Sequence, residues 1–379
     1  MTDIIGFLVY EMVLRLAKVK LKTKKTHSNV ALLVKTDELG DYILFRNYLP
    51  QLIAHFKRAN TQLVFVGNAL WKDLFESYDN DPAIISCIWI NKKQFNSSMR
   101  YRFGILRQLR SIPFTVACNL VVSRNRRVDD ALMAAADCKD RLGYADDFCN
   151  MTRLEHFFNR RLYKNVVTTP AVCHDFLKHP YFIATLTHTQ TPAPALALPV
   201  TNNIIATPLP ANYVVLFPGS GKKDKIWATE KFVTVAIFLK ETYGYHICLA
   251  GSAADAVYAD EFKKKIDSGV TDFCGKTNFR QLIELVQKSQ LVVSIDTGSV
   301  HVAAACNKPC FAIFNGIHWG RFAPYPAILQ KKVVALYPPS VEAQTANAII
   351  TDPQQVVPGN FNDVSAGQMI NAIRSFMGK

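Results

Sequence analysis

The sequence lacks three features that would place it in common structural classes. No apolar stretch among its 379 residues is long and uninterrupted enough to cross a bilayer, and no heptad pattern persists. Glycine is limited to 17 residues without a triplet repeat, which excludes a collagen-like chain. Because hydrophobic residues make up 49% of the chain and charged residues 20%, the composition predicts folded domains rather than disorder.

Paired cysteines are also lacking. The nine cysteines are scattered, mostly in apolar runs, and only Cys306 and Cys310 lie close together in the sequence. Because this C-x3-C has no second pair and no suitably spaced histidines, it does not predict a zinc site. Scattered thiols in apolar runs are typical of a reducing compartment, so we expect a cytoplasmic protein.

Common nucleotide-binding motifs are missing as well. No G-x-G-x-x-G follows an expected strand, and the GKT at 275–277 follows Gly269 at the wrong spacing for a P-loop. The D-x-D of residues 79–81 has a form used in metal-dependent sugar transfer. Since Asn80 and Pro82 belong to the same stretch, we interpret it as an ordinary turn.

Negative charge is scarce relative to positive charge, and the formal net charge is +14. Residues 1–180 hold 27 Lys and Arg against 17 Asp and Glu, whereas residues 181–379 hold 17 against 13. The N-terminal half therefore favours an acidic partner such as phosphate, anionic lipid or nucleic acid. No recognition motif or interleaving of aromatic and basic residues supports nucleic acid, so we expect none to bind.

Residues 1–29 combine an apolar stretch with a basic tract. The apolar stretch at 4–19 contains Glu11, Arg15 and Lys18, and lysines follow at 20, 22, 24 and 25. A secretory signal has the opposite order of charge and apolar residues. Two interpretations stay open: an amphipathic helix on an anionic inner leaflet, or a first helix packed on the domain surface. The inner-membrane surface is thus a second expected location.

From residue 30 onward, short apolar runs alternate with helix-length segments. Expected strands in the first part are 30–34, 62–67, 84–90 and 114–122, with helices near 41–57, 68–78 and 99–111. In the second part, expected strands begin at 213, 246, 291 and 309, with helices near 229–242, 256–267, 278–289 and 300–306. This alternation predicts an α/β protein built from βαβ units with parallel sheets.

We divide the chain into five regions. They are a basic leader (1–29), an N-terminal Rossmann-like domain (30–180), a Pro-rich linker (181–212), a C-terminal Rossmann-like domain (213–360) and a C-terminal helix (361–379). Two doubly wound domains imply a cleft between them, with ligands at the carboxyl ends of the strands.

Two loops after expected strands hold candidate binding residues. Gly40 and Asp41 follow the first strand, where Asp41 places a carboxylate at the head of a helix; the alternative is simple capping of that helix. The second loop is PGSGKKDKIW (218–227), whose glycines let backbone N–H groups turn toward an anion. Its lysines suit phosphate groups, and the alternative is an exposed basic turn.

A third loop, SIDTGSVHVAAA (294–305), joins a strand to a helix of small residues. Its turn offers N–H groups and hydroxyls to a nucleotide. The alternatives are that Asp296 caps the helix and that His301 is an ordinary buried histidine.

Together these segments resemble glycosyltransferase family 9, best known for the lipopolysaccharide heptosyltransferases. The resemblance covers most of residues 30–326, with LGD (39–41), LAGS (249–252), the long run around DTGSVH and GRFAPY (320–325) as further elements. It implies a GT-B fold with two Rossmann-like doubly wound domains facing a central cleft. The N-terminal domain binds the acceptor and the C-terminal domain the donor nucleotide. It also implies inverting chemistry without an essential metal or a cofactor.

The resemblance assigns roles to individual positions. It makes Asp41 the general base and Lys225 the residue that neutralises the donor diphosphate. The implied donor site further comprises Gly219, Ser220, Gly221, Lys222, Asp296, Thr297, Gly298 and His301. The acceptor is expected near Gly40 and near Arg124, Arg126 and Arg127 after the strand 114–122, for which a solvated loop is the alternative. One departure is Asn315-Gly316-Ile317-His318, which stands where the family commonly has G-x-T-D.

The expected function is transfer of a sugar, heptose from ADP-heptose, to a lipopolysaccharide-core or related glycan. The expected partners are a nucleotide-sugar donor and an anionic glycan or glycolipid acceptor. One alternative is a nucleotide-sugar epimerase or hydrolase on the same fold, which nucleotide release without acceptor would favour. Another is a non-catalytic nucleotide-sugar or glycan-binding protein at the membrane, which binding without turnover would favour.

Overall fold

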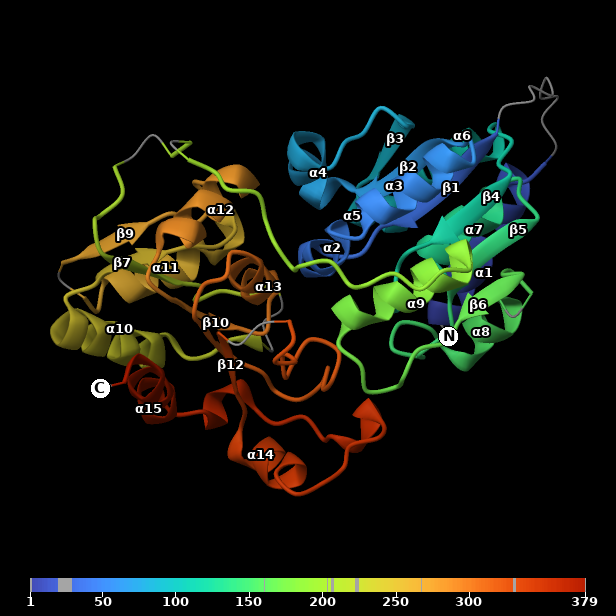
Figure 1. Ribbon diagram of the computed structural model, residues 1–379. Coiled ribbons are helices and arrows are strands. Elements are labelled where there is room, and N and C mark those ends of the chain that lie inside the picture. Colours follow the sequence, from blue (N-terminus) through green and yellow to red (C-terminus); the bar gives the residue numbers. More distant parts are fainter. Residues whose placement is uncertain are drawn as a thin grey trace. The chain divides into compact units, whose positions relative to one another are not determined.

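The computed structural model describes residues 2–19, 29–159, 161–202, 204–205, 208–221, 225–266, 268–329 and 332–378. The chain divides into two compact units (Figure 1). Unit 1 comprises Met1–Pro170 and Phe176–Pro194, and unit 2 comprises Ala171–Asp175 and Ala195–Lys379.

Unit 1 is built on a six-stranded sheet in the order β3-β2-β1-β4-β5-β6, in which every neighbouring pair is parallel. Its strands are β1 (Val30–Lys35), β2 (Gln62–Asn68), β3 (Ile84–Ile90), β4 (Val116–Asn119), β5 (Asp140–Tyr144) and β6 (Asn165–Val167). Its helices are α1 (Thr2–Ala17), α2 (Leu39–Arg46), α3 (Leu49–Arg58), α4 (Lys72–Tyr78), α5 (Lys92–Ser97), α6 (Met99–Arg110), α7 (Asp129–Ala135), α8 (Arg153–Asn159) and α9 (Asp175–Thr187), of which Asp175 belongs to unit 2.

Unit 2 repeats this plan with the sheet order β12-β11-β10-β7-β8-β9, again with parallel neighbours. Its strands are β7 (Tyr213–Leu216), β8 (His246–Leu249), β9 (Val270–Asp272), β10 (Val292–Ile295), β11 (Cys310–Ile313) and β12 (Val333–Leu336). Its helices are α10 (Thr229–Tyr243), α11 (Ala256–Lys263), α12 (Phe279–Lys288), α13 (Gly298–Ala305), α14 (Pro339–Thr345) and α15 (Ala366–Met377).

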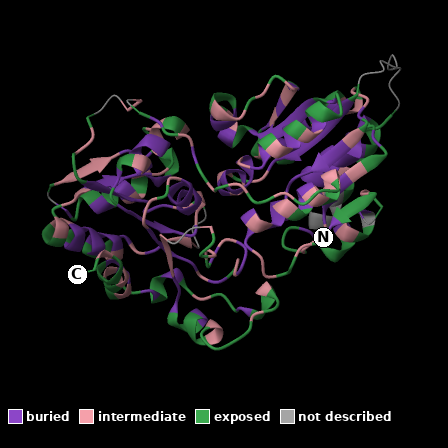
Figure 2. Cartoon of the chain, viewed as in Figure 1, coloured by how far each residue is buried: buried purple, intermediate pink, exposed green. Residues whose placement is uncertain are grey.

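The central strands of both sheets are buried, because helices cover both faces of each sheet (Figures 1 and 2). Every residue of β1, β7, β10 and β11 is buried. Strands enclosed on both faces are expected to be continuous apolar runs, and VVSI and CFAI have that character. The predicted α/β class with two doubly wound parallel sheets is confirmed.

Three expected elements differ from the structure. The strand expected over 114–122 is shorter, because β4 ends at Asn119 and its Oδ1 accepts a hydrogen bond from Val121 N in the following loop. The helix expected near 41–57 is two helices, α2 and α3, with Pro50 at the start of α3, where a proline N–H is not needed. The range expected as linker begins in a helix, since α9 extends to Thr187 and buries Phe182 and Ile183.

The leader contains helix α1, which packs on unit 1. Val13, Leu14 and Ala17 lie in the same buried cluster as Val30 and Leu32 of β1. The first helix is therefore docked on the domain, as one of the two open interpretations held. Within the described residues, no helix has the length and apolar character needed to cross a membrane.

Candidate active site

In each sheet, one pair of neighbouring strands marks the place from which the strand order continues outward in opposite directions, the topological switch point. In unit 1 this point lies between β1 and β4, and in unit 2 it lies between β7 and β10. In open α/β sheets, ligands bind outside the carboxyl ends of the strands at such switch points. The unit 1 site therefore consists of residues 36–41 and 120–128, and the unit 2 site of residues 217–221, 225–228 and 296–301.

An ion pair spans the switch point of unit 2. The Nζ of Lys225 lies 2.5 Å from Oδ2 of Asp296, and both side chains are largely buried. The same Nζ is 3.4 Å from the backbone oxygen of Asp296. The structure thus brings together two of the predicted donor residues from loops 71 positions apart in the sequence. A buried ammonium here offers a strong attraction to a diphosphate.

The glycine-rich loop of unit 2 is shaped by a residue that the sequence reasoning did not single out, Asp255. Asp255 accepts hydrogen bonds from the backbone N and the Oγ of Ser252, each at 2.7 Å. A Cβ at Gly219 would lie 2.0 Å from Asp255 Oδ1, and one at Gly251 would lie 2.8 Å from Oδ2. Both glycines are therefore needed for close packing of the loops after β7 and β8 against one carboxylate.

The turn after β10 leads directly into α13. Thr297 is the extended residue before the helix, which starts at Gly298. The Oγ atoms of Ser294 and Ser299 are 2.6 Å apart, as are Thr297 Oγ1 and Ser299 Oγ, so a chain of hydroxyls fixes this turn. The positive end of the α13 dipole thus lies at the switch point, where it favours an anion.

His301 is a buried, uncharged residue of α13. Its Nδ1 hydrogen bonds with the hydroxyl of Tyr325, and its ring packs on Phe322. Burial lowers the pKa of His301 to about 4, against a smaller opposing effect of the Asp296 carboxylate. The ring is therefore neutral at pH 7 and acts as a hydrogen-bonding group rather than as a cation.

The GRFAPY segment is held by the separate stretch Ala171–Asp175 of unit 2, which lies far from it in the sequence. Arg321 Nη2 lies 2.8 Å from Asp175 Oδ2, and Asp175 N donates to the Arg321 carbonyl. A Cβ at Gly320, which has a φ of +77°, would meet Val172 Cγ1 at 2.6 Å. These contacts fix the segment that supplies Tyr325 to His301.

The stretch that replaces the family's G-x-T-D lies beside Asp296. Gly316 and His318 line a small cavity together with Asp296, and its other walls are Phe314, Trp319, Ala323 and Tyr337. The buried hydroxyl of Tyr337 has no hydrogen-bond partner among the described residues. Ile317 and His318 thus stand where the family commonly has Thr and Asp, and aromatic rings form much of the cavity wall beside them.

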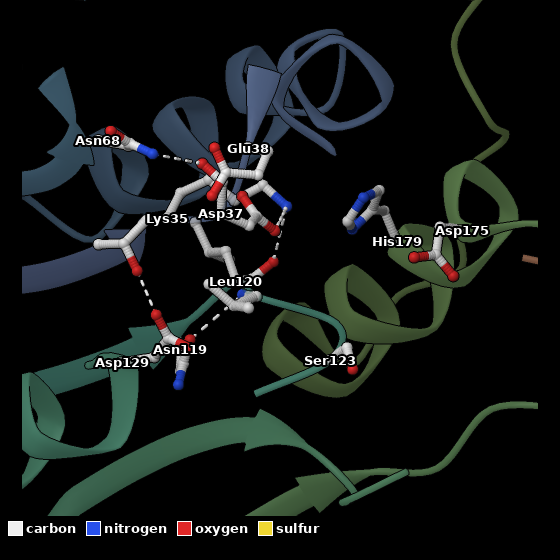
Figure 3. Close-up of polar contacts among 12 residues, drawn as sticks. Lys35, Asp37, Glu38, Asn68, Asn119, Leu120, Ser123, Asp129, Asp175 and His179 are labelled. Carbon is white, nitrogen blue, oxygen red and sulfur yellow. Dashed lines mark hydrogen bonds and ion pairs between the residues drawn. The ribbon is translucent and has the colours of Figure 1, made fainter. Parts of the chain in front are cut away.

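A buried lysine organises the unit 1 site (Figure 3). Lys35, at the end of β1, has a side chain only 1% exposed, and its Nζ lies 2.8 Å from Asp37 Oδ2. The same Nζ donates to the carbonyl of Leu120 at 3.2 Å, which joins the loops after β1 and β4. Lys35 thus spans the switch point of unit 1, as Lys225 does in unit 2.

Asp37 is the most perturbed carboxyl of the unit 1 site. Burial raises its pKa to about 7, although the ammonium of Lys35 lowers it, and the carboxylates of Asp41 and Asp129 raise it further. Its Oδ1 is buried without a hydrogen-bond partner among the described residues. The backbone oxygen of Asp37 accepts hydrogen bonds from Asn68 Nδ2 and Trp71 Nε1, both at 3.1 Å, which fixes the loop. The sequence reasoning missed Lys35 and Asp37.

Gly40 and Asp41 lie in the first turn of α2. The residue preceding the helix is Glu38, so Asp41 is not its N-cap. Gly40 is buried and Asp41 is half-buried. The helix dipole favours the ionised form of a carboxylate at this position. The alternative of simple capping is thereby disfavoured, and the role of Asp41 as base stays a prediction.

The arginines after β4 point inward rather than into solvent. Arg124 Nη1 lies 2.7 Å from Asp130 Oδ2, and Arg126 Nη2 lies 2.7 Å from Glu11. Arg127 Nε, from a more exposed side chain, lies 3.0 Å from Glu155 Oε1. The solvated-loop alternative is therefore wrong for Arg124 and Arg126. Their internal ion pairs also favour a structural role, and acceptor contact remains a prediction that rests chiefly on Arg127.

The sequence also predicts Ser220, Gly221 and Lys222 as donor-binding residues. Ser220 is half-buried and Gly221 exposed at the end of the described loop. Lys222 lies outside the described residues. The D-x-D carboxylates are engaged in unit 1, Asp79 with Arg46 at 2.5 Å and Asp81 with Lys57 at 2.8 Å. Across the part of the chain that the structure describes, no three His, Cys, Asp or Glu side chains gather as metal ligands.

Comparison with known proteins shows which family this chain belongs to. The sequence pattern of glycosyltransferase family 9 (heptosyltransferase) matches residues 131–347, more than half of the chain. The chain belongs to glycosyltransferase family 9. The resemblance found in the sequence is therefore confirmed, and the family 9 match includes the turn after β10.

Individual relatives of this family 9 chain are heptosyltransferases by name. Lipooligosaccharide heptosyltransferase 2 of Haemophilus influenzae is 35% identical over 78 residues, 20% of this chain and 22% of the relative. The chain thus spans about a fifth of that relative's length. Lipooligosaccharide heptosyltransferase 2 of Campylobacter jejuni is 22% identical over 295 residues, 76% of this chain and 82% of the relative.

A solved structure supports the fold. The E. coli ADP-heptose lps heptosyltransferase II matches with a TM-score of 0.63 and 16% identity, covering 92% of this chain and 98% of that chain. At this identity the likeness shows the fold alone, and it confirms the predicted GT-B class.

Proposed function

We propose that this protein is an inverting, metal-independent glycosyltransferase that moves heptose from ADP-heptose to a lipopolysaccharide-core or related glycan. The observation that carries the proposal is the buried Lys225–Asp296 pair at the switch point of unit 2 in a family 9 chain. The donor and acceptor classes are supported by the names of the relatives, which include an ADP-heptose lps heptosyltransferase and lipooligosaccharide heptosyltransferases.

In this proposal, unit 2 binds the donor. Lys225 and the N-terminus of α13 attract the diphosphate, and the Gly219–Gly221 loop supplies backbone N–H groups. As the sugar leaves, the diphosphate gains negative charge, which these fixed positive groups stabilise. The neutral His301 contributes a hydrogen bond rather than a second positive charge.

Unit 1 binds the acceptor and supplies the base. An acceptor hydroxyl attacks the anomeric carbon, so a new carbon–oxygen bond forms while the bond to the diphosphate oxygen breaks. The hydroxyl proton passes to Asp41, and the nucleoside diphosphate leaves with the electron pair. One displacement inverts the anomeric configuration. A carboxylate is by nature a weak base, and partial removal of water around it makes it a better proton acceptor.

We place this activity in the cytoplasm, at the inner-membrane surface. None of the nine cysteines, all of which lie within the described residues, forms a disulfide, as suits a reducing compartment. The anionic acceptor is then a glycan or glycolipid at that surface.

The test begins with calorimetric titration of ADP, UDP, GDP and CDP into the full chain. We expect selective binding of ADP. A transfer assay with ADP-heptose and a heptose-free core acceptor then tests turnover, with and without EDTA, and NMR of the product gives the anomeric configuration. Activity lost in EDTA contradicts metal independence, and retained configuration contradicts the single displacement.

The variant Asp41→Asn tests the base. We expect transfer to fall by about 10² to 10⁴ while ADP binding persists. Asp73→Asn is the matched control, because Asp73 is also in the first turn of a unit 1 helix. Full turnover in Asp41→Asn removes Asp41 from the mechanism. Preference for another nucleotide overturns ADP-heptose, and nucleotide release that needs no acceptor points to a hydrolase.

A further inference from the structure

Helix α1 exposes a row of large apolar side chains. Leu8, Met12 and Leu16 are 56%, 55% and 54% exposed, and Val19 just beyond the helix is 60% exposed. Because residues four apart lie on one side of a helix, the first three form a continuous row. We call Leu8, Met12, Leu16 and Val19 the α1 face.

The other side of α1 is fixed to unit 1. Besides the buried Val13, Leu14 and Ala17, the Tyr10 hydroxyl donates to the Asn96 carbonyl at 2.7 Å. Arg107 Nη1 donates to the Val19 carbonyl at 2.7 Å, which anchors the end of the segment. Because the opposite side of α1 is fixed to unit 1, the α1 face stays exposed on an ordered helix. A helix apolar on both sides needs a second apolar environment.

The charges around the α1 face are positive. Arg15 and Lys18 are exposed beside it. Helix α1 has two acidic residues, Asp3 and Glu11. Glu11, which lies between Leu8 and Met12 in the sequence, is turned inward to Arg126 at 2.7 Å. The sequence then adds lysines at 20, 22, 24 and 25. Apolar side chains flanked by basic ones match the two layers of an anionic bilayer surface, the acyl region and the headgroups.

We propose that the α1 face docks on a bilayer rich in anionic phospholipid, with α1 lying in the plane of the surface. A 16-residue helix interrupted by Glu11 and Arg15 is suited to lying in the interface rather than spanning it. The inference supports the surface location in the proposed function but requires neither donor nor acceptor. Vesicle binding without transfer activity therefore upholds it while the proposed enzyme function fails.

The experiment is co-sedimentation of the full chain with vesicles of phosphatidylcholine alone or with one part in three of phosphatidylglycerol. We expect binding to the anionic vesicles only, weakening as salt screens the basic residues. The variant Met12→Glu with Leu16→Glu is expected to lower the partition coefficient at least about tenfold, because two apolar side chains that enter the acyl region are replaced by carboxylates that the anionic surface repels.

The matched control is Val257→Glu with Ile349→Glu, which changes the net charge equally at two exposed apolar residues of unit 2. We expect its binding to stay within about twofold of wild type. Thermal melts and circular dichroism check that each variant is folded. Unchanged binding of Met12→Glu with Leu16→Glu overturns the proposal, as does absence of binding to anionic vesicles. A dimer in sedimentation equilibrium that the same variant dissociates assigns the α1 face to a second copy and also overturns it.

Discussion

Lys225 and Asp296 form a buried ion pair, 2.5 Å between Nζ and Oδ2, that joins the loop after β7 to the end of β10. In unit 1, Lys35 joins the loops after β1 and β4 through Asp37 and the Leu120 carbonyl. Both units therefore place a buried ammonium at the point where strand order reverses. Such a charge is costly to bury unless it is paired, so each lysine holds its own loops in place before any ligand arrives.

The two members of the Lys225–Asp296 pair should affect nucleotide binding in opposite directions. Lys225→Met removes the attraction for a diphosphate and is expected to weaken ADP binding about tenfold or more. Asp296→Asn removes a competing carboxylate and is expected to strengthen ADP binding several-fold. Calorimetry measures both, with Lys264→Met, an exposed residue just beyond α11, as control. If both variants weaken ADP equally, Asp296 itself contacts the donor and does not merely hold Lys225.

Two glycines of the same loop should differ sharply in their tolerance of a methyl group. Gly219→Ala places a Cβ 2.0 Å from Asp255 Oδ1, whereas a Cβ at Gly221 meets none of the described residues within 4 Å. We expect Gly219→Ala to lower the free energy of unfolding by about 1–3 kcal/mol, and Gly221→Ala to change it by less than about 0.5 kcal/mol. Urea denaturation measures both.

A second substitution tests the cause assigned to the Gly219 effect. In a chain that already carries Asp255→Gly, adding Gly219→Ala should lower the free energy of unfolding very little further, because the clashing side chain is absent. Additive losses in the double variant mean that Asp255 is not what excludes the methyl group.

The Lys35–Asp37 pair predicts a pH-dependent effect. The pKa of Asp37 in the folded chain is raised to about 7. Between the ordinary pKa of an aspartate and pH 7, the folded chain therefore binds a proton that the unfolded chain does not, so stability falls as pH rises. Lys35→Met removes the ammonium that lowers this pKa, so the fall should continue above pH 7. The destabilisation by Lys35→Met should therefore be larger at pH 8.5 than at pH 5.5, by up to about 1.4 kcal/mol per pH unit above 7.

Urea denaturation at pH 5.5, 7 and 8.5 measures this effect. Lys93→Met, an exposed lysine in α5 next to Lys92, is the control and should show no such trend. A constant destabilisation by Lys35→Met across this range shows that Asp37 does not titrate there.

The strands of both sheets could be predicted from the sequence, but the contacts that Lys225 and Lys35 make across the switch points could not. Ile84–Ile90 forms a strand where one was predicted, because a short, mostly apolar run between turn residues is typical of a buried strand. Lys225 and Asp296 were singled out by motif, yet their contact depends on β7 and β10 being neighbours, which no local pattern encodes. Lys35 was missed because a lysine at the end of a strand ordinarily reaches solvent. Only the pairing of β1 with β4 brings the Leu120 carbonyl within reach of its Nζ.

The inward orientation of Arg124 and Arg126 after β4 was likewise not evident from the sequence, because their partners come from other elements. Arg124 pairs with Asp130, which is 0% exposed, so Arg124→Met strands a buried carboxylate and should cost about 3–5 kcal/mol of unfolding free energy. Arg127 is more exposed, and Arg127→Met should cost no more than about 1 kcal/mol. A change confined to the acceptor KM is expected for Arg127→Met alone, since its guanidinium is the more accessible. Thermal melts and acceptor titrations measure the two effects separately. If Arg124→Met instead keeps its stability and raises the acceptor KM, Arg124 contacts the acceptor, and its ion pair with Asp130 opens when the acceptor binds.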